Sequence, residues 1–249
     1  MPTDPEYVFD DPLPLTGERT APGIPEENYW FQRHVVAYEW AARRTAGRRV
    51  LDAGCGEGYG TQILAATAGE VVGVDLEAGV VERAAARYPS ARFEPADLEA
   101  LPYPDASFDA VVSLQVIEHM RSPVDFCGEA ARVLRPGGEF LCATPNRITF
   151  SPRGIRNAFH TVEFSPAELR AVLARHFTVT EMLGTFHAGR IRATEIATRS
   201  SLPERLIATP VPQWSQRRRA AVARITTRDF RIRGEHLDRS LDLIAVGRR

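Results

Sequence analysis

The sequence predicts an α/β fold in which a mostly parallel sheet carries helices on both faces. Short apolar stretches of strand length alternate with stretches of helical periodicity over most of the chain. A glycine-rich loop joins the first predicted strand to the helix after it. The composition, with 44% hydrophobic and 25% charged residues among 249, is that of an ordinary globular protein.

The alternation begins after a distinct N-terminal region. Residues 1–25 are rich in Pro, Asp, Thr and Gly and are predicted to form an irregular arm, which a helix over residues 26–44 follows. We expect residues 1–47 to cover a cofactor or acceptor site, and residues 48–249 to form the main domain.

Strands and helices then follow one another in chain order. The run Arg135-Pro136-Gly137-Gly138 is a strong helix stop, and Ser165 before Pro166 is a helix start. The predicted strands cover residues 49–53, 71–75, 91–95, 109–114, 139–144, 177–183 and 241–246, and the helices cover residues 59–67, 78–88, 125–134 and 166–175.

Residues 185–240 break this rhythm. Prolines at 203, 210 and 212 interrupt the stretch, and a run of three arginines follows at 217–219. We predict an insertion before the last strand and not a second domain. The arginine run is most simply a solvated helix face.

The loop after the first strand is the strongest local signal. It contains Gly54, Gly56 and Gly58 in a Gly-x-Gly-x-Gly pattern, and glycine permits the positive φ and close backbone approach that a ligand requires. The loop lies at the carboxyl end of a strand, where open α/β sheets bind ligands. The second strand ends in Asp75, about twenty residues further on, as expected for a carboxylate that binds ribose hydroxyls.

A nicotinamide-dependent dehydrogenase shares parts of this pattern. However, the loop here reads Asp-x-Gly-x-Gly-x-Gly, and a helix-bearing segment precedes the first strand. Asp97 also follows the third strand, where an adenine amine could be recognised, and the chain has no Tyr-x-x-x-Lys or comparable hydride-transfer set. These differences make a dehydrogenase the less favoured interpretation.

Five segments together resemble a known family. They are residues 50–60, 71–75, 101–109, 115–119 and 134–138. As a set they resemble the class I S-adenosylmethionine-dependent methyltransferases over residues 48–184. The resemblance implies a Rossmann-like fold with seven strands in the order 3-2-1-4-5-7-6, the last antiparallel.

The resemblance also implies S-adenosyl-L-methionine as the cofactor and S-adenosyl-L-homocysteine as its product. The three loop glycines would surround the amino-acid part of the cofactor, with Gln115 beside its methionine moiety. Asp75 would hold the ribose, and Asp97 with Leu98 would contact the adenine. The expected cofactor-binding set is Asp52, Gly54, Gly56, Gly58, Tyr59, Asp75, Leu76, Asp97, Leu98 and Gln115.

The remaining segments carry a narrower resemblance. Residues 15–20, 27–34, 144–152, 159–161 and 240–245 resemble the methyltransferase encoded in the mycobacterial methylglucose lipopolysaccharide gene cluster. This resemblance implies O-methylation of a sugar hydroxyl, on an α-glucan or a glycolipid precursor. Two alternatives stay open: an O-methyltransferase of a quinone or other small secondary metabolite, and a non-catalytic protein that binds the cofactor and supports another enzyme.

A hydroxyl acceptor must lose its proton, and histidine is the usual base. His119 follows the fourth strand and is the first candidate among six histidines, although its imidazole could equally cap a short helix. His160, after the fifth strand, is the second candidate. Some related quinone-biosynthesis O-methyltransferases carry Glu-x-x-Glu-His at this place, whereas this chain has Gln115 in the first position. Glu118 and His119 alone do not define a metal site, so we expect no metal.

The net charge and the cysteine content limit the partners and the cellular location that we expect. The net charge of −1 provides no electrostatic footprint for nucleic acid. Three scattered cysteines indicate reduced thiols and a cytoplasmic protein, and no stretch has the length and apolarity of a membrane span or signal peptide. The expected partner is a sugar or small-molecule acceptor. The oligomeric state stays open, with a dimer among the alternatives.

Overall fold

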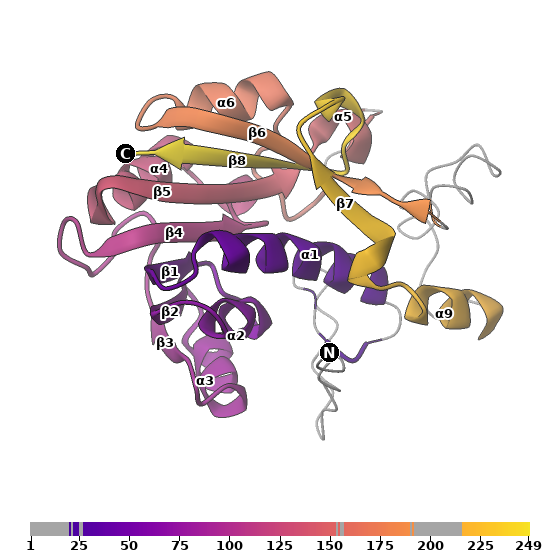
Figure 1. Ribbon diagram of the computed structural model, residues 1–249, viewed down its shortest axis with the longest axis horizontal. Coiled ribbons are helices and arrows are strands. Elements are labelled where there is room, and N and C mark those ends of the chain that lie inside the picture. The colour runs from indigo at the N-terminus through magenta and orange to yellow at the C-terminus, as the bar shows by residue number, and fades with distance from the viewer. Residues whose placement is uncertain are drawn as a thin grey trace.

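Eight strands form one sheet, in the order β3-β2-β1-β4-β5-β8-β6-β7 (Figure 1). The computed structural model describes residues 20, 22–24, 27–152, 154, 157–189, 191 and 216–249. The strands are β1 Arg49–Ala53, β2 Glu70–Asp75, β3 Arg92–Pro95, β4 Phe108–Leu114, β5 Leu134–Pro145, β6 Thr178–His187, β7 Phe230–Arg233 and β8 Asp242–Arg248.

Helices connect these strands. The α-helices are α1 Asn28–Arg44, α2 Tyr59–Ala65, α3 Ala78–Arg87, α4 Pro123–Val133, α5 Arg147–Phe150, α6 Pro166–Leu173 and α9 Gln216–Ala223, and the 3-10 turns are η1 Ile117–His119, η3 Thr227–Asp229 and η4 Leu237–Arg239. The predicted stop after α4 is confirmed at Val133. The predicted start of α6 is also confirmed, because Ser165 and Glu168 form a capping box there.

The predicted order of the sheet is confirmed, and the predicted strand count is one too low. The seventh predicted strand is β8, which pairs antiparallel with β5 and β6. The additional strand is β7, which pairs antiparallel with the end of β6 within the region predicted as an insertion. Its four residues, Phe-Arg-Ile-Arg, lie at the edge of the sheet and provide too short an apolar pattern to predict a strand.

The parallel strands β1, β2, β4 and β5 all end at one side of the sheet, which we name the carboxyl edge. β8 runs in the opposite direction, so its first residue lies at this edge. Its register pairs Asp242 with both Pro145 of β5 and Thr185 of β6. Residues from three distant parts of the chain, on β5, β6 and β8, therefore meet here.

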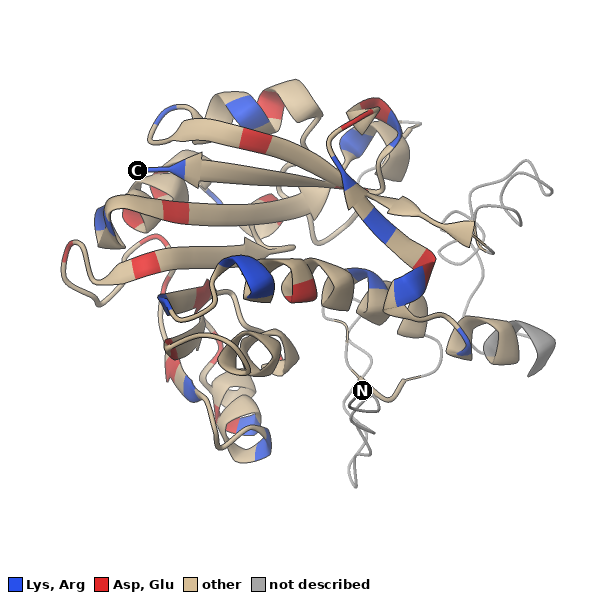
Figure 2. Cartoon of the chain, viewed as in Figure 1, with Lys and Arg blue, Asp and Glu red and all other residues tan. Residues whose placement is uncertain are grey.

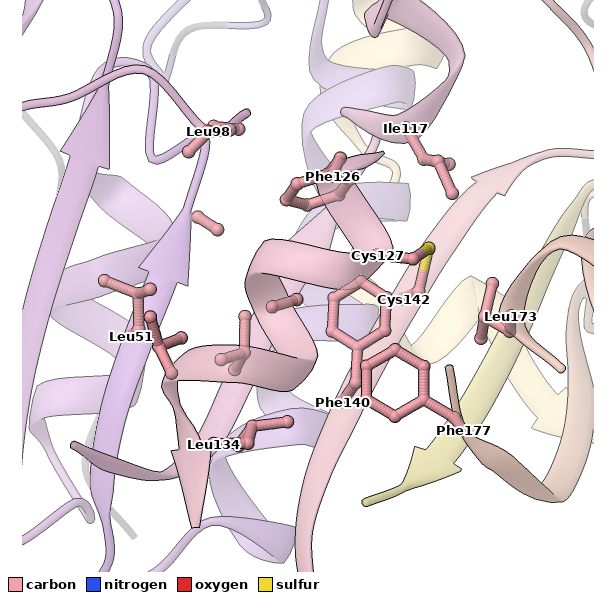
Figure 3. Packing of buried hydrophobic residues seen from close by; sticks show 14 of the residues in the cluster. Leu51, Leu98, Ile117, Phe126, Cys127, Leu134, Phe140, Cys142, Leu173 and Phe177 are labelled. Carbon is pink, nitrogen blue, oxygen red and sulfur yellow. The ribbon is translucent and has the colours of Figure 1, made fainter. Parts of the chain in front are cut away.

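Two hydrophobic layers enclose the sheet. On one face α4 and α6 pack Phe126, Cys127 and Leu173 against Phe140 and Cys142 of β5, all of them fully buried (Figure 3). On the other face α1 and α2 pack against β1 and β4. Burying apolar residues on both faces explains why the central strands are almost continuously hydrophobic.

The acidic residues of β4 and β5 lie away from the carboxyl edge. In Figure 2 the single acidic band on each of β4 and β5 lies in the first half of the strand. These acids are Asp109 and Glu139, and both pair with arginines: Asp109 with Arg135, and Glu139 with Arg44 and Arg48. Ion pairs thus stabilise the amino-terminal ends of β4 and β5.

Several sequence predictions lie outside the described residues. They concern most of the N-terminal arm, residues 190 and 192–215 of the predicted insertion, and the side chains of the arginine run at 217–219. Among the described residues, no helix combines the length and apolarity that crossing a membrane requires.

Candidate functional site

The glycine loop adopts the conformation that its sequence predicts. Gly54, Gly56 and Gly58 have φ values of 87°, 51° and 83°, in the region that favours glycine. A Cβ on Gly58 would lie 2.8 Å from Ala84 of α3 and 3.0 Å from the ring of Phe93. Gly58 is therefore required for the close packing of α2 on α3 and β3, in addition to any contact with a ligand.

Asp52 lies beneath this loop. Its carboxylate accepts hydrogen bonds from the hydroxyl of Thr61, at 2.6 Å, and from the hydroxyl of Tyr38, at 3.2 Å. Burial raises the pKa of Asp52 to about 7. This predicted cofactor residue ties β1, α2 and α1 together under the loop.

Asp75 occupies the expected position at the end of β2. One carboxylate oxygen accepts the Gly56 amide at 3.0 Å, and the other accepts the Glu77 amide at 3.2 Å. Asp75 thus fixes the backbone of the glycine loop at Gly56. Leu76, next in the chain, is 71% exposed and available for contact with a ligand.

The acid after β3 lies next to this position. β2 and β3 pair Asp75 with Pro95, so Asp97 follows directly at the same edge. The side chain of Asp97 accepts the Glu99 amide at 2.9 Å and remains exposed, whereas Leu98 is buried in the core. Of this predicted pair, Asp97 is the residue that the structure presents at the surface.

Tyr59 is directed toward α1. Its hydroxyl lies 3.1 Å from the hydroxyl of Thr20 and 3.1 Å from Nδ1 of His34, and Thr20 lies 2.9 Å from the same nitrogen. Burial lowers the pKa of His34 to about 4, so this imidazole is neutral at pH 7. The arrangement fastens α1 and the described Thr20 of the arm against the start of α2.

A buried ion pair supports Gln115. The backbone of Gln115 has a φ of 62°, and its side-chain amide donates to Asp242 at 3.3 Å. Asp242 in turn accepts from Nε of Arg33 at 2.6 Å, and each of the two paired side chains is at most 3% exposed. Sequence reasoning missed this pair, because 209 residues separate its members and neither belongs to a local motif.

The two candidate bases lie together at the carboxyl edge. The rings of His119 and His160 meet edge to face, with centroids 5.1 Å apart. Buried Glu118 joins them, and one ligand atom from each of the three residues lies within 4.8 Å of the others. We call Glu118, His119 and His160 the imidazole cluster.

Each member of the imidazole cluster has a defined partner. Nδ1 of His119 lies 2.9 Å from the carbonyl of Phe159, and Nδ1 of His160 lies 2.9 Å from Oε1 of Glu163. The Thr144 hydroxyl donates to Glu118 at 2.8 Å, and burial raises the pKa of Glu118 to about 8. Sequence reasoning found the two histidines but missed these supporting residues, because their contacts form only in the folded chain.

Known proteins share this fold and much of the sequence. The methyltransferase domain family matches residues 51–142. A relative from Mycolicibacterium smegmatis, described as a probable S-adenosylmethionine-dependent methyltransferase, is 45% identical over 98% of this chain and 98% of its own length. The 27-O-demethylrifamycin SV methyltransferase of Amycolatopsis mediterranei is 46% identical over 51% of this chain and 53% of its own length.

A crystal structure of an S-adenosylmethionine-dependent methyltransferase from Thermotoga maritima has the same fold. It superposes with a TM-score of 0.62 over 90% of this chain and 94% of the other, at 19% identity. The fold is thus the Rossmann-like fold of that methyltransferase. Given the near full-length relative, the chain belongs to the S-adenosylmethionine-dependent methyltransferase family, with S-adenosyl-L-methionine as the methyl donor.

Proposed function

We propose that this methyltransferase acts on oxygen and transfers the methyl group to a sugar hydroxyl on an α-glucan or glycolipid precursor. The observation that carries the proposal is the imidazole cluster at the carboxyl edge, next to the residues expected to hold the cofactor. A neutral amine can take the methyl group before it loses a proton and has less need of such a base, whereas a hydroxyl must lose its proton as it reacts.

The tautomer of His119 suits this role. A carbonyl oxygen only accepts hydrogen bonds, so the contact with Phe159 places the imidazole proton on Nδ1 and the lone pair on Nε2. In the reaction the acceptor O–H bond breaks and its proton passes to Nε2. When bound, S-adenosyl-L-methionine would supply the methyl group, so that an O–CH₃ bond would form as the S–CH₃ bond breaks and S-adenosyl-L-homocysteine would be left as a neutral sulfide. His160 is the second candidate for the same proton.

The cofactor-binding residues supply position and exclusion of water. In this proposal the loop at Gly54 and Gly56 surrounds the amino-acid part of the cofactor, and Asp75 accepts the ribose hydroxyls. Gln115, held by Asp242, lies beside the methionine moiety. We also propose that α1 and the arm cover this site, supported by the contacts of His34 and Thr20 with Tyr59.

The experiment is a transfer assay with methyl-labelled S-adenosyl-L-methionine and α-glucan oligosaccharides. We expect label in the sugar, and a loss of kcat of about 10²–10⁴-fold in His119→Ala, the range for removal of a general base. His176→Ala, an exposed histidine elsewhere, is the matched control and should keep full activity. Unlabelled glucan together with a labelled phenol would refute the sugar acceptor.

The second candidate acceptor is a small secondary metabolite. It is favoured by the similarity to the 27-O-demethylrifamycin SV methyltransferase, whose name specifies an acceptor lacking an O-methyl group. The same assay with a panel of quinones and macrocyclic hydroxyls separates the two. Cofactor binding without transfer to any acceptor would instead favour a non-catalytic partner protein.

A further inference from the structure

The imidazole cluster is assembled from two segments that the fold holds in a fixed relation. Glu118 and His119 belong to the turn η1 after β4, and His160 follows β5. The amide of Thr161 donates to the Glu118 carbonyl at 2.8 Å, and its hydroxyl donates to the carbonyl of Met120 at 2.6 Å. These bonds position the cluster before any ligand arrives, which lowers the cost of binding one.

Both imidazoles are oriented as metal ligands usually are. A ligating histidine typically donates its second ring N–H to a carbonyl or a carboxylate, which fixes the tautomer and the ring. Here Nδ1 of His119 donates to the Phe159 carbonyl, and Nδ1 of His160 donates to the carboxylate of Glu163. In each ring the lone pair therefore lies on Nε2.

The third group completes a recognised donor set. The Glu118 carboxylate is 1% exposed, and the Thr144 hydroxyl donates to one of its oxygens. Two imidazoles and one carboxylate suit divalent first-row transition metals, and in zinc enzymes this set leaves an open coordination position. Mg²⁺ and Ca²⁺ prefer oxygen ligands alone.

We propose that Glu118, His119 and His160 bind one divalent transition-metal ion, of the Zn²⁺ or Mn²⁺ type, at the carboxyl edge of the sheet. This replaces our expectation of no metal. That expectation rested on two adjacent ligands, and the fold supplies a third from 41 residues further along the chain.

The use of this ion in catalysis rests on the proposed function. An ion with an open position binds the acceptor hydroxyl oxygen and lowers the pKa of that hydroxyl, as bound zinc does for water. The O–H proton then leaves to solvent, the oxygen attacks the methyl carbon, and the carbon–sulfur bond breaks. No electron is exchanged, so a redox-inert ion suffices. In the ion-loaded protein His119 acts as a ligand, and the ion takes over activation of the hydroxyl.

The test uses Co²⁺ as a visible probe on the full chain after treatment with a chelator. Titration should produce an absorption band that saturates at one equivalent, and Zn²⁺ should displace it. We expect His160→Ala and Glu118→Gln to abolish the band. Glu163→Gln, which removes the charge beside Nδ1 of His160, should weaken binding about 10–100-fold. The matched control His176→Ala should bind as the wild type does.

The decisive outcomes are separate for the metal and for the reaction. Absence of a saturable band in the wild type, or an unchanged band in both His160→Ala and His119→Ala, overturns the metal site. His119→Ala is included because the His119 side chain is only partly buried, so its removal should leave the protein folded. Melting curves are the check that each variant is folded. Hydroxyl methylation that is unaffected by chelation refutes the role of the ion in the reaction and leaves the proposed function intact. Metal binding without methyl transfer to any hydroxyl refutes the proposed function and leaves the metal site intact.

Discussion

Neutralising Asp242 should destabilise the protein far more than neutralising a surface acid. Arg33 is 2% exposed and donates through Nε to Asp242 at 2.6 Å and through its terminal nitrogen to the Leu241 carbonyl at 2.8 Å. Asp242→Asn leaves the guanidinium buried without its counter-charge. Breaking such a pair costs about 3–5 kcal/mol, a large share of the roughly 5–15 kcal/mol that keeps a protein folded.

The assay is urea unfolding followed by circular dichroism, with Glu70→Gln as the matched control. Glu70 pairs with Arg49 at 2.9 Å and is 49% exposed, so its neutralisation should cost about 0–1 kcal/mol. The Asp242→Asn loss corresponds to a decrease in Tm of roughly 6–20 °C for a chain of this size.

A double variant tests the electrostatic explanation itself. Replacing the pair with apolar residues of similar volume, as Arg33→Met with Asp242→Leu, should recover much of the stability because no buried charge remains unpaired. Equal effects of Asp242→Asn and Glu70→Gln would refute the reasoning.

Two further predictions concern the glycine loop and the helix α1. Gly58→Ala should lower the free energy of unfolding by about 1–3 kcal/mol more than Gly47→Ala. Both glycines have positive φ, but only at Gly58 would the new Cβ meet neighbouring atoms. Equal losses of stability in urea unfolding would contradict this prediction. The folded-state pKa of His34, about 4, lies below the ordinary value of 6.5. The neutral imidazole therefore contributes its full stability to the fold above pH 6.5, and this contribution is lost as the pH falls toward 4. Between pH 6.5 and 4 the wild type should therefore lose about 3 kcal/mol more than His34→Gln, and parallel stability curves for the two proteins would disprove this.

The sequence was sufficient to predict most of the sheet. Buried parallel strands are nearly continuous runs of Val, Ile, Leu and Ala, and caps and stops such as Ser165 and Arg135-Pro136-Gly137-Gly138 mark the helices between them. The positive φ at Gly54, Gly56 and Gly58 was predictable for the same reason, since it depends on residue type and local context. β7 was not predictable, because four edge residues carry too little periodicity.

The candidate site was only partly predictable, because much of it depends on contacts across the fold. His119 and His160 could be chosen by their place after strands, but their meeting depends on how β4 and β5 align. The support of Gln115 by Asp242 follows from the antiparallel register of β8, which local patterns do not encode. Sequence motifs thus predicted the conformation of the glycine loop, which is proposed to bind the cofactor, better than the groups proposed to act on the acceptor.

The most direct test of the central claim is calorimetric titration of the protein with S-adenosyl-L-homocysteine. We predict saturable one-to-one binding at micromolar concentration, and a large loss of affinity in Asp75→Ala, which removes the carboxylate that holds the Gly56 amide and is proposed to bind the ribose. A melting curve for Asp75→Ala confirms that the variant is folded. Absence of binding to the wild type would contradict the assignment of the cofactor, and undiminished binding to folded Asp75→Ala would contradict its proposed place in the site.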